Sequence, residues 1–188
     1  MSNPRGRGGR ERIVAAAAAL FEAQGITATT MEQIAAKAPV SKRTLYAHFP
    51  AKEHLVVTFL RYVYESGWTV ESALDDPQVP ARERILSMFT VPVRGDGPVR
   101  GCPFTAAATE FPDPDSPAHA YTRDRKHTFG IRLAELLTEM GAEDPAGLAE
   151  QLAILADGVA SRAMVFNDSR RGDLGRAAAE ALLVAAGL

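Results

Sequence analysis

The chain of 188 residues is long enough to bury a hydrophobic core, and 46% hydrophobic and 23% charged residues are typical of a soluble protein. Its single cysteine excludes an internal disulfide, and the lack of an export segment or a membrane-length apolar run predicts a cytoplasmic protein without membrane contact. The net charge of −2 combines eight basic and three acidic residues in 1–52 with 13 basic and 20 acidic residues beyond. This polarity suits a protein that meets phosphate at one end, and equally a solvated basic terminus.

Helical periodicity dominates the chain, and no stretch shows the β-branched alternation of strands, so we predict an all-α fold. We expect residues 1–9 to form a disordered basic tail. The first helix is predicted from about Arg10 to Gln24. The second begins at Thr30, which is a good N-cap and forms a capping box with Gln33.

A proline separates the second helix from the third. Pro39 has no N–H and ends the second helix, and Ser41 then caps a third helix that extends to about Phe49 with Leu45 facing inward. A long amphipathic helix is predicted over 51–74.

The remaining helices alternate with loops rich in Pro, Gly and Asp. About nine helices are expected in all. Those of the second half are predicted at 81–91, 103–110, 118–140, 145–166 and 174–186.

Two short helices joined by a turn of three to four residues are the geometry of a helix-turn-helix, in which the second helix enters the major groove of DNA. Here these helices span 30–37 and 41–47. With Leu45 turned inward, four side chains project outward near the N-terminal end of the second of them, which is the end that reaches base edges: Lys42, Arg43, Thr44 and Tyr46.

The segment from Thr30 to Leu55 closely resembles the signature of the TetR family of bacterial transcriptional regulators. The resemblance is strong over about residues 10–60, and beyond them it covers length, helix count and a weaker likeness around 100–110. It is carried jointly by Thr30, Ile34-Ala35, Val40-Ser41, Thr44-Leu45-Tyr46, His48-Phe49 and Lys52.

The resemblance implies an N-terminal three-helix DNA-binding domain at 10–52, followed by a helical effector-binding and dimerisation domain at 53–188. It implies a sequence-specific regulator, most often a repressor, that a small-molecule ligand releases from a palindromic operator in double-stranded DNA. The last two helices would pair with those of a second copy to form a homodimer. The spacing of apolar and small residues in 145–166 and 174–186 is compatible with that pairing.

Individual roles also follow from the resemblance. Base contacts fall to Lys42 and Arg43, with Thr44 and Glu32 as secondary candidates. Ser41 belongs to the predicted DNA-binding set as the cap of the reading helix. Contacts to phosphate are assigned to Thr30, Tyr46, His48 and Lys52. An arm in the minor groove is a further option for Arg5, Arg7 and Arg10, which are otherwise disordered.

One residue departs from the family pattern. Family members usually carry Gly where this chain has Pro39, and that glycine suits positive φ, which proline does not adopt. The turn is therefore expected to use different dihedrals and to alter how the second helix sits against the first.

The predicted effector pocket lies among the helices between the long one and the last two, and pockets of this kind are mostly apolar with a few polar groups. Trp68 and Phe89 could instead belong to the core, Asp157 to the subunit interface, and His127 to the surface. A redox role is open to Cys102, although a buried thiol is more often inert. The candidates are Trp68, Phe89, Cys102, Phe104, Thr105, Tyr121, His127 and Asp157.

Two other functions remain to be weighed. An enzyme is disfavoured, because the lone cysteine has no local His or Asp partner, the four histidines lack metal-ligand spacing and no glycine motif cradles phosphate, so no catalytic residue, metal or cofactor is predicted. The alternative is a dimeric DNA-binding regulator without an effector, in which side chains would fill the interior of the second domain and leave no pocket.

Overall fold

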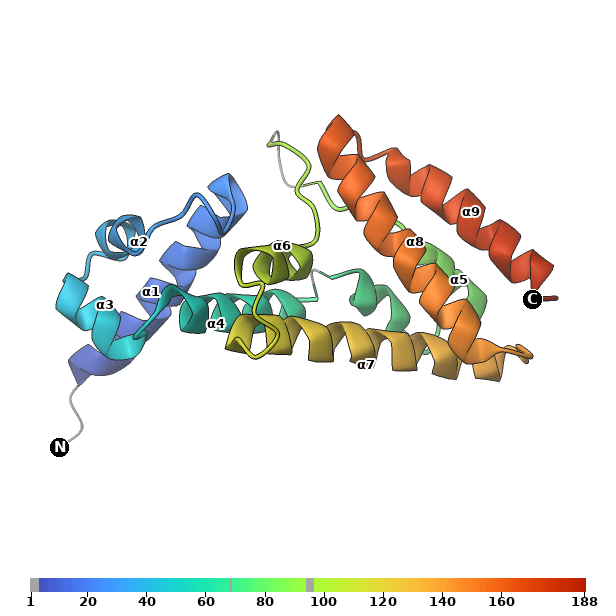
Figure 1. Ribbon diagram of the computed structural model, residues 1–188, viewed down its shortest axis with the longest axis horizontal. Helices are drawn as coiled ribbons and strands as arrows, with labels where there is room; N and C mark the ends of the chain where they lie inside the picture. Colours follow the sequence, from blue (N-terminus) through green and yellow to red (C-terminus); the bar gives the residue numbers. More distant parts are fainter. Residues whose placement is uncertain (1–3, 68, 94–96) are drawn as a thin grey trace. The chain divides into compact units, whose positions relative to one another are not determined.

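The computed structural model describes residues 4–67, 69–93 and 97–188, with side chains from residue 8 onward. All regular structure in these residues is helical, which confirms the all-α prediction (Figure 1). The α-helices are α1 (Pro4–Gln24), α2 (Met31–Lys37), α3 (Lys42–His48), α4 (Lys52–Glu65), α5 (Ala81–Ser87), α6 (Pro103–Glu110), α7 (Pro117–Glu139), α8 (Pro145–Phe166) and α9 (Arg171–Ala185), and a short 3-10 helix, η1, spans Val70–Leu74.

The chain divides into two compact units. The first unit combines Met1–Val63 with Pro103–Thr122, and the second combines Tyr64–Cys102 with Arg123–Leu188. The first unit thus holds α1 to α3 with most of α4, all of α6 and the start of α7. The predicted boundary at residue 52 separates a DNA-binding domain from an effector-binding domain. These two units are defined by compactness and not by function, so that boundary stays a prediction.

The first unit is built around aromatic and aliphatic side chains that α1 and α4 bring together. Phe21 of α1 and Phe59 of α4 meet edge to face, with ring centroids 5.1 Å apart. Ile34 of α2 and Leu45 of α3 are fully buried in the same unit. Because aromatic pairs and buried aliphatic side chains stabilise a core, the short helices α2 and α3 gain a fixed support.

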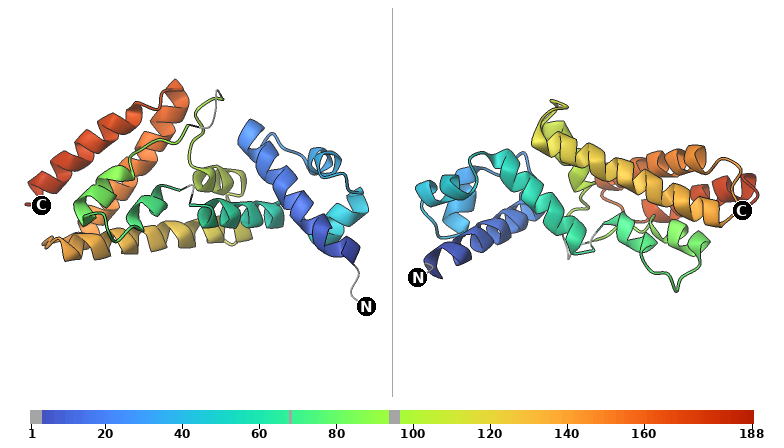
Figure 2. Two further views of the ribbon diagram at one scale, coloured as in Figure 1. Left: turned by 180° about the vertical axis from the view of Figure 1, so that it is seen from behind. Right: turned by 90° about the horizontal axis from the view of Figure 1, so that it is seen from below.

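The core of the second unit is shared by α5, α7, α8 and α9. The last two helices run side by side and antiparallel (Figure 2). Asp144 caps the start of α8 by accepting a hydrogen bond from the N–H of Gly147 at 2.9 Å. Asn167 ends the helix in the left-handed conformation, with a φ of 48°, and this turns the chain toward α9.

Several helix boundaries differ from the sequence-based expectation. The helix expected over 81–91 ends at Ser87, and the one expected over 174–186 spans Arg171–Ala185. The helix expected over 51–74 ends at Glu65, because Gly67 adopts a φ of 71° and the chain re-enters helical structure only in η1. The first helix begins at Pro4 rather than Arg10, so residues 4–9 are helical and not part of the expected disordered tail. Proline suits the first helical position, since its φ is already helical and its missing N–H is not needed there.

Among the described residues, no helix combines the length and the apolar character that crossing a membrane requires.

Candidate nucleic-acid interface

α2 and α3 form a helical hairpin that packs on α1. One face of each short helix is buried: Ile34 in α2, and Leu45 in α3 at 0% exposure. Phe49 follows α3 and is buried as well. Because these side chains fix the roll of α3, the residues on its opposite face point into solvent.

The turn between the helices has the 6→1 hydrogen bond of a Schellman motif, but Pro39 cannot donate the second bond of that motif. The N–H of Val40 donates to the carbonyl of Ala35 at 3.1 Å, and the N–H of Ala38 donates to Ile34 at 2.9 Å. Pro39 lies between them with a φ of 23°. The expectation that proline would force other dihedrals is therefore wrong: the motif holds Pro39 at positive φ, against the preference of its ring near about −65°.

Both short helices begin with the predicted caps. The N–H of Gln33 donates to Thr30 Oγ1 at 3.2 Å, and the Gln33 side chain accepts the N–H of Thr30 at 2.8 Å, which completes the capping box. Ser41 Oγ accepts the N–H of Thr44 at 3.1 Å. The two hydroxyls of Ser41 and Thr44 are also 2.8 Å apart, so both polar groups stabilise the start of α3.

The outer face of α3 is basic. Lys42 and Arg43 are exposed, and Lys42 Nζ lies 3.0 Å from Glu32 Oε1 of α2. The hydrogen bond from Lys42 lowers the pKa of Glu32 below its ordinary value. In the unbound protein Glu32 thus orients Lys42, while Arg43 extends alone from the first turn of the helix.

The residues predicted to contact phosphate lie around this face. Tyr46 is exposed, and His48 is half-buried beside Gly9 of α1. Lys52 begins α4, but its ammonium is held by Glu110 at 2.5 Å. Arg10, one of the residues considered for a minor-groove arm, packs over the ring of Phe49 at 5.3 Å.

Three predicted effector residues fall in the first unit. Phe104 is buried and stacks on Tyr121, with ring centroids 6.5 Å apart. The guanidinium of Arg61 lies over the ring of Tyr121, 5.4 Å from the ring centroid. Thr105 is exposed, so the structure brings together two of the three side chains.

Four more predicted effector residues belong to the second unit, and Trp68 lies outside the described residues. Phe89 is buried in the core, Cys102 is a half-buried free thiol and His127 is exposed. Asp157 is exposed and pairs with Lys126 of α7.

Lys126 links two of these candidates electrostatically. Burial favours its neutral form, but electrostatic interaction with Cys102 and the hydrogen bond to Asp157 together raise the pKa of Lys126 above its ordinary value. Sequence inspection did not single out this lysine, because nothing local to it signals the distant acids.

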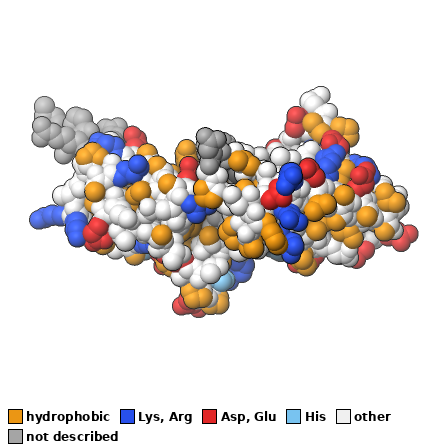
Figure 3. Space-filling view, turned by 90° about the horizontal axis from the view of Figure 1, so that it is seen from above, with side chains coloured by type: hydrophobic (Ala, Val, Ile, Leu, Met, Phe, Trp, Pro, Cys, Tyr) orange, Lys and Arg blue, Asp and Glu red, His pale blue; other side chains and the backbone are white. Residues whose placement is uncertain are grey.

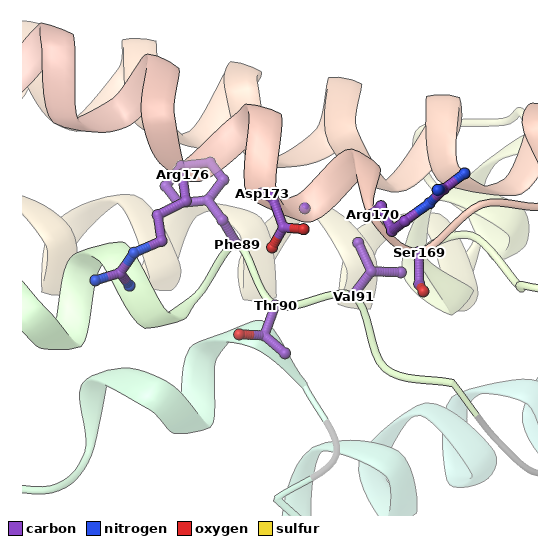
Figure 4. Close-up of a pocket in the computed structure, with 8 residues that line it drawn as sticks. Phe89, Thr90, Val91, Ser169, Arg170, Asp173 and Arg176 are labelled. Atoms are coloured by element: carbon purple, nitrogen blue, oxygen red, sulfur yellow. The ribbon is translucent and has the colours of Figure 1, made fainter.

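A hollow of about 220 Å³ opens in the second unit beside the start of α9 (Figure 4). Phe89 is the one predicted effector residue in its lining. The lining consists of Phe89, Thr90, Val91, Ser169, Arg170, Gly172, Asp173 and Arg176.

A buried ion pair in the second unit was also not predicted. Arg125 of α7 bonds to Glu71 of η1 and stacks on the ring of Tyr64 at 3.6 Å. Burial raises the pKa of Glu71, and the charge of Arg125 opposes that shift without cancelling it. Only the fold shows that these residues meet, since η1 and α7 are far apart in sequence. Among the residues whose placement is described, no three His, Cys, Asp or Glu side chains gather as a metal site.

Comparisons with known proteins agree with the helix-turn-helix geometry. Residues 13–58 match the family described as bacterial regulatory proteins, tetR family. The chain is 30% identical over 178 residues to the HTH-type transcriptional regulator YjdC of Escherichia coli K12, and this match covers 93% of both chains.

Solved structures extend the likeness to the whole fold. A protein assigned as a tetR transcriptional regulator (sav143) from Streptomyces avermitilis is 32% identical with a TM-score of 0.82, over 96% of this chain and 98% of that one. SCO4454, a TetR-family transcriptional regulator from Streptomyces coelicolor, is 25% identical with a TM-score of 0.82, over 97% of each chain.

Proposed function

The chain belongs to the TetR family of bacterial transcriptional regulators, and from that premise we propose that it is a cytoplasmic repressor that a small-molecule effector releases from a palindromic operator. Its relatives are DNA-binding regulators, which are not enzymes. One observation carries the proposal for DNA reading: α3 exposes Lys42 and Arg43 while Leu45 behind them is fully buried.

We assign contacts to bases and contacts to phosphates to different residues. Lys42 and Arg43 donate to base edges, where a basic side chain most often meets guanine O6 and N7. Thr30, Tyr46 and His48 hold phosphates, as does Lys52, and these contacts position the head without reading sequence. Support comes from the exposure of Lys42, Arg43 and Tyr46 on one side of the hairpin.

The proposed dimer forms through α8 and α9. Hydrophobic side chains gather on the face that these helices make, on the right of Figure 3. An exposed apolar patch of this kind typically marks an interface. The large hydrophobic side chains that α8 and α9 expose are Ile154, Met164, Val165, Phe166, Leu174 and Val184. Two heads on one dimer would read half-sites about 34–36 Å apart, which is one turn of DNA.

Release follows if the effector binds one arrangement of the dimer more tightly than the other. The difference in affinity sets the coupling between effector and operator, typically about 1–3 kcal/mol. A specific observation favours the second candidate, a dimeric regulator without an effector. Phe104, which was predicted to line the pocket, is instead buried in the first unit and stacks on Tyr121.

Selection of bound DNA from a random library tests the proposal. We expect a palindrome whose half-sites lie about 10–10.5 base pairs apart, centre to centre. Lys37→Ala is a matched control for substitutions of Lys42 or Arg43, because Lys37 is an exposed lysine of α2 outside the predicted reading set. A library that yields no enriched sequence would contradict the DNA-reading role.

A metabolite screen for release of the selected DNA then separates the two candidates. Compounds that both raise the melting temperature and release DNA support the effector, since binding to the folded state stabilises it. Release by none of a broad set of metabolites favours the regulator without an effector.

A further inference from the structure

The lysine at the start of α4 is already paired with a carboxylate. Lys52 Nζ lies 2.5 Å from Oε1 of Glu110, the last residue of α6. The two side chains are only 20% and 16% exposed. The ammonium of Lys52, which was predicted to bind phosphate, is therefore paired inside the first unit instead of being exposed to solvent.

We infer that Glu110 competes with DNA phosphate for the ammonium of Lys52, so that the position of α6 sets how strongly the start of α4 binds DNA. This inference rests on the proposed DNA-binding function of the first unit.

Burial makes the pair hard to separate. Charges attract more strongly where water is excluded, and a buried carboxylate that loses its cation is left uncompensated. Glu110 Oε2 is buried and accepts no hydrogen bond from the described part of the chain, so Lys52 is the cation that offsets this carboxylate.

A phosphate would add a second anion beside the same cation. The start of a helix with a nearby lysine attracts phosphate, because the first N–H groups carry partial positive charge. With Glu110 in place, however, two anions would share one ammonium and repel each other. Removing the charge of Glu110 should strengthen the grip on phosphate.

A second contact ties the same end of α4 to α7. Glu53 accepts a hydrogen bond from the N–H of Ala118 at 3.1 Å, and Ala118 is fully buried. Consecutive residues of α4 thus contact the end of α6 and the start of α7. An effector that keeps the pair of Lys52 and Glu110 closed would weaken DNA binding through this route.

A double-mutant cycle tests the competition, with Glu110→Gln, Lys52→Met and the double variant measured on the selected operator. Glutamine keeps the shape of glutamate, and methionine keeps the apolar stem of the largely covered lysine. We expect Glu110→Gln to raise operator affinity about tenfold. The slope of log affinity against log salt should steepen by about 0.9, as for one added phosphate contact.

In the Lys52→Met background, Glu110→Gln should change the affinity less than about twofold, since the lysine that it frees is gone. The matched control is Asp115→Asn, which removes the same charge from an exposed residue of the loop after α6. An equal gain from Asp115→Asn, or an equal gain without Lys52, would mean general electrostatics and would overturn the competition. Unchanged or weaker binding by Glu110→Gln would overturn it too.

Wild-type protein offers a test that needs no variant. In ¹⁵N spectra, the Lys52 ammonium should show slow hydrogen exchange in the free protein and a shifted signal with operator DNA. A rapidly exchanging ammonium in the free protein would overturn the inference. Wild-type protein that binds no specific DNA would instead contradict the proposed function, and the two failures are therefore distinguishable.

Discussion

Pro39 lies at the C′ position of α2, where a Schellman motif requires positive φ and an N–H that donates to the carbonyl of the residue three before it, Ala36. It adopts a φ of 23°, and it has no N–H to donate. The bond from Val40 to Ala35 still forms, so the turn keeps its shape with one hydrogen bond fewer. A backbone held in this region costs about 1–3 kcal/mol.

Pro39→Gly should therefore stabilise the protein by about 1 kcal/mol. Glycine removes the strain and restores the donor, and these gains exceed the roughly 0.4–1 kcal/mol of unfolded-state entropy that proline saves. Denaturant unfolding at constant pH measures the change. Pro50→Gly is the matched control: Pro50 has no positive φ, so its replacement should lower stability. A Pro39→Gly variant less stable than wild type would contradict the strain.

Contacts between near neighbours were predictable, and distant ones were not. The capping box of Thr30 and Gln33 and the cap at Ser41 follow from residue types within one helical turn, and the structure contains both. Lys52 was assigned to phosphate from its place in the signature. Its partner Glu110 is 58 residues away, and no local pattern signals that contact.

At the scale of elements, the sequence predicts helices better than their ends. Apolar residues continue at helical spacing from α4 through Leu74, so periodicity alone predicted one long helix. Gly67 breaks it, because positive φ ends the helix and lets Ser72 Oγ donate to the Gly67 carbonyl at 2.7 Å. The break allows η1 to bury Glu71 against α7.

Glu71 should make the stability of the second unit depend on pH. Burial raises its folded-state pKa above the ordinary value of a glutamate, so the protonated form is favoured and its contribution to stability is lost as pH rises through that pKa. The Glu71→Gln variant lacks this titration. We expect the free energy of unfolding of wild type, minus that of Glu71→Gln, to fall as pH rises from about 4, where an ordinary glutamate begins to ionise.

Denaturant unfolding of both proteins at several pH values gives this difference. Other titrating groups cancel because the two proteins share them. A difference that increases with pH would mean that the charge of Arg125 outweighs burial and lowers the pKa of Glu71.

At the scale of the whole molecule, α8 and α9 bury one face in the second unit and expose another apolar face. Leu152 and Leu183 are fully buried, whereas Ile154 and Val184 of the same helices are exposed. The sequence predicted the apolar spacing of both helices. It could not assign each residue to the core or to the outer face, because both faces are apolar.

Ile154→Glu should weaken the proposed homodimer about a hundredfold, since a charge would be buried without a partner. Sedimentation velocity over a concentration series measures the dimer dissociation constant. Ile131→Glu is the matched control: Ile131 is 47% exposed on α7, compared with 64% for Ile154 on α8. Dimerisation that survives Ile154→Glu, or that fails equally in the control, would contradict the interface.

The claim that α3 reads DNA sequence through its exposed basic residues is tested most directly by the specificity of Arg43→Ala. The measurement is the ratio of affinities for the selected operator and for operators changed at one base pair, taken at one salt concentration for wild type, Arg43→Ala and Lys37→Ala. We expect Arg43→Ala to lose about 1–3 kcal/mol of discrimination at one base pair of each half-site and to keep it elsewhere. Lys37→Ala should keep the wild-type ratios. Arg43→Ala with unchanged ratios at every base pair would contradict the claim.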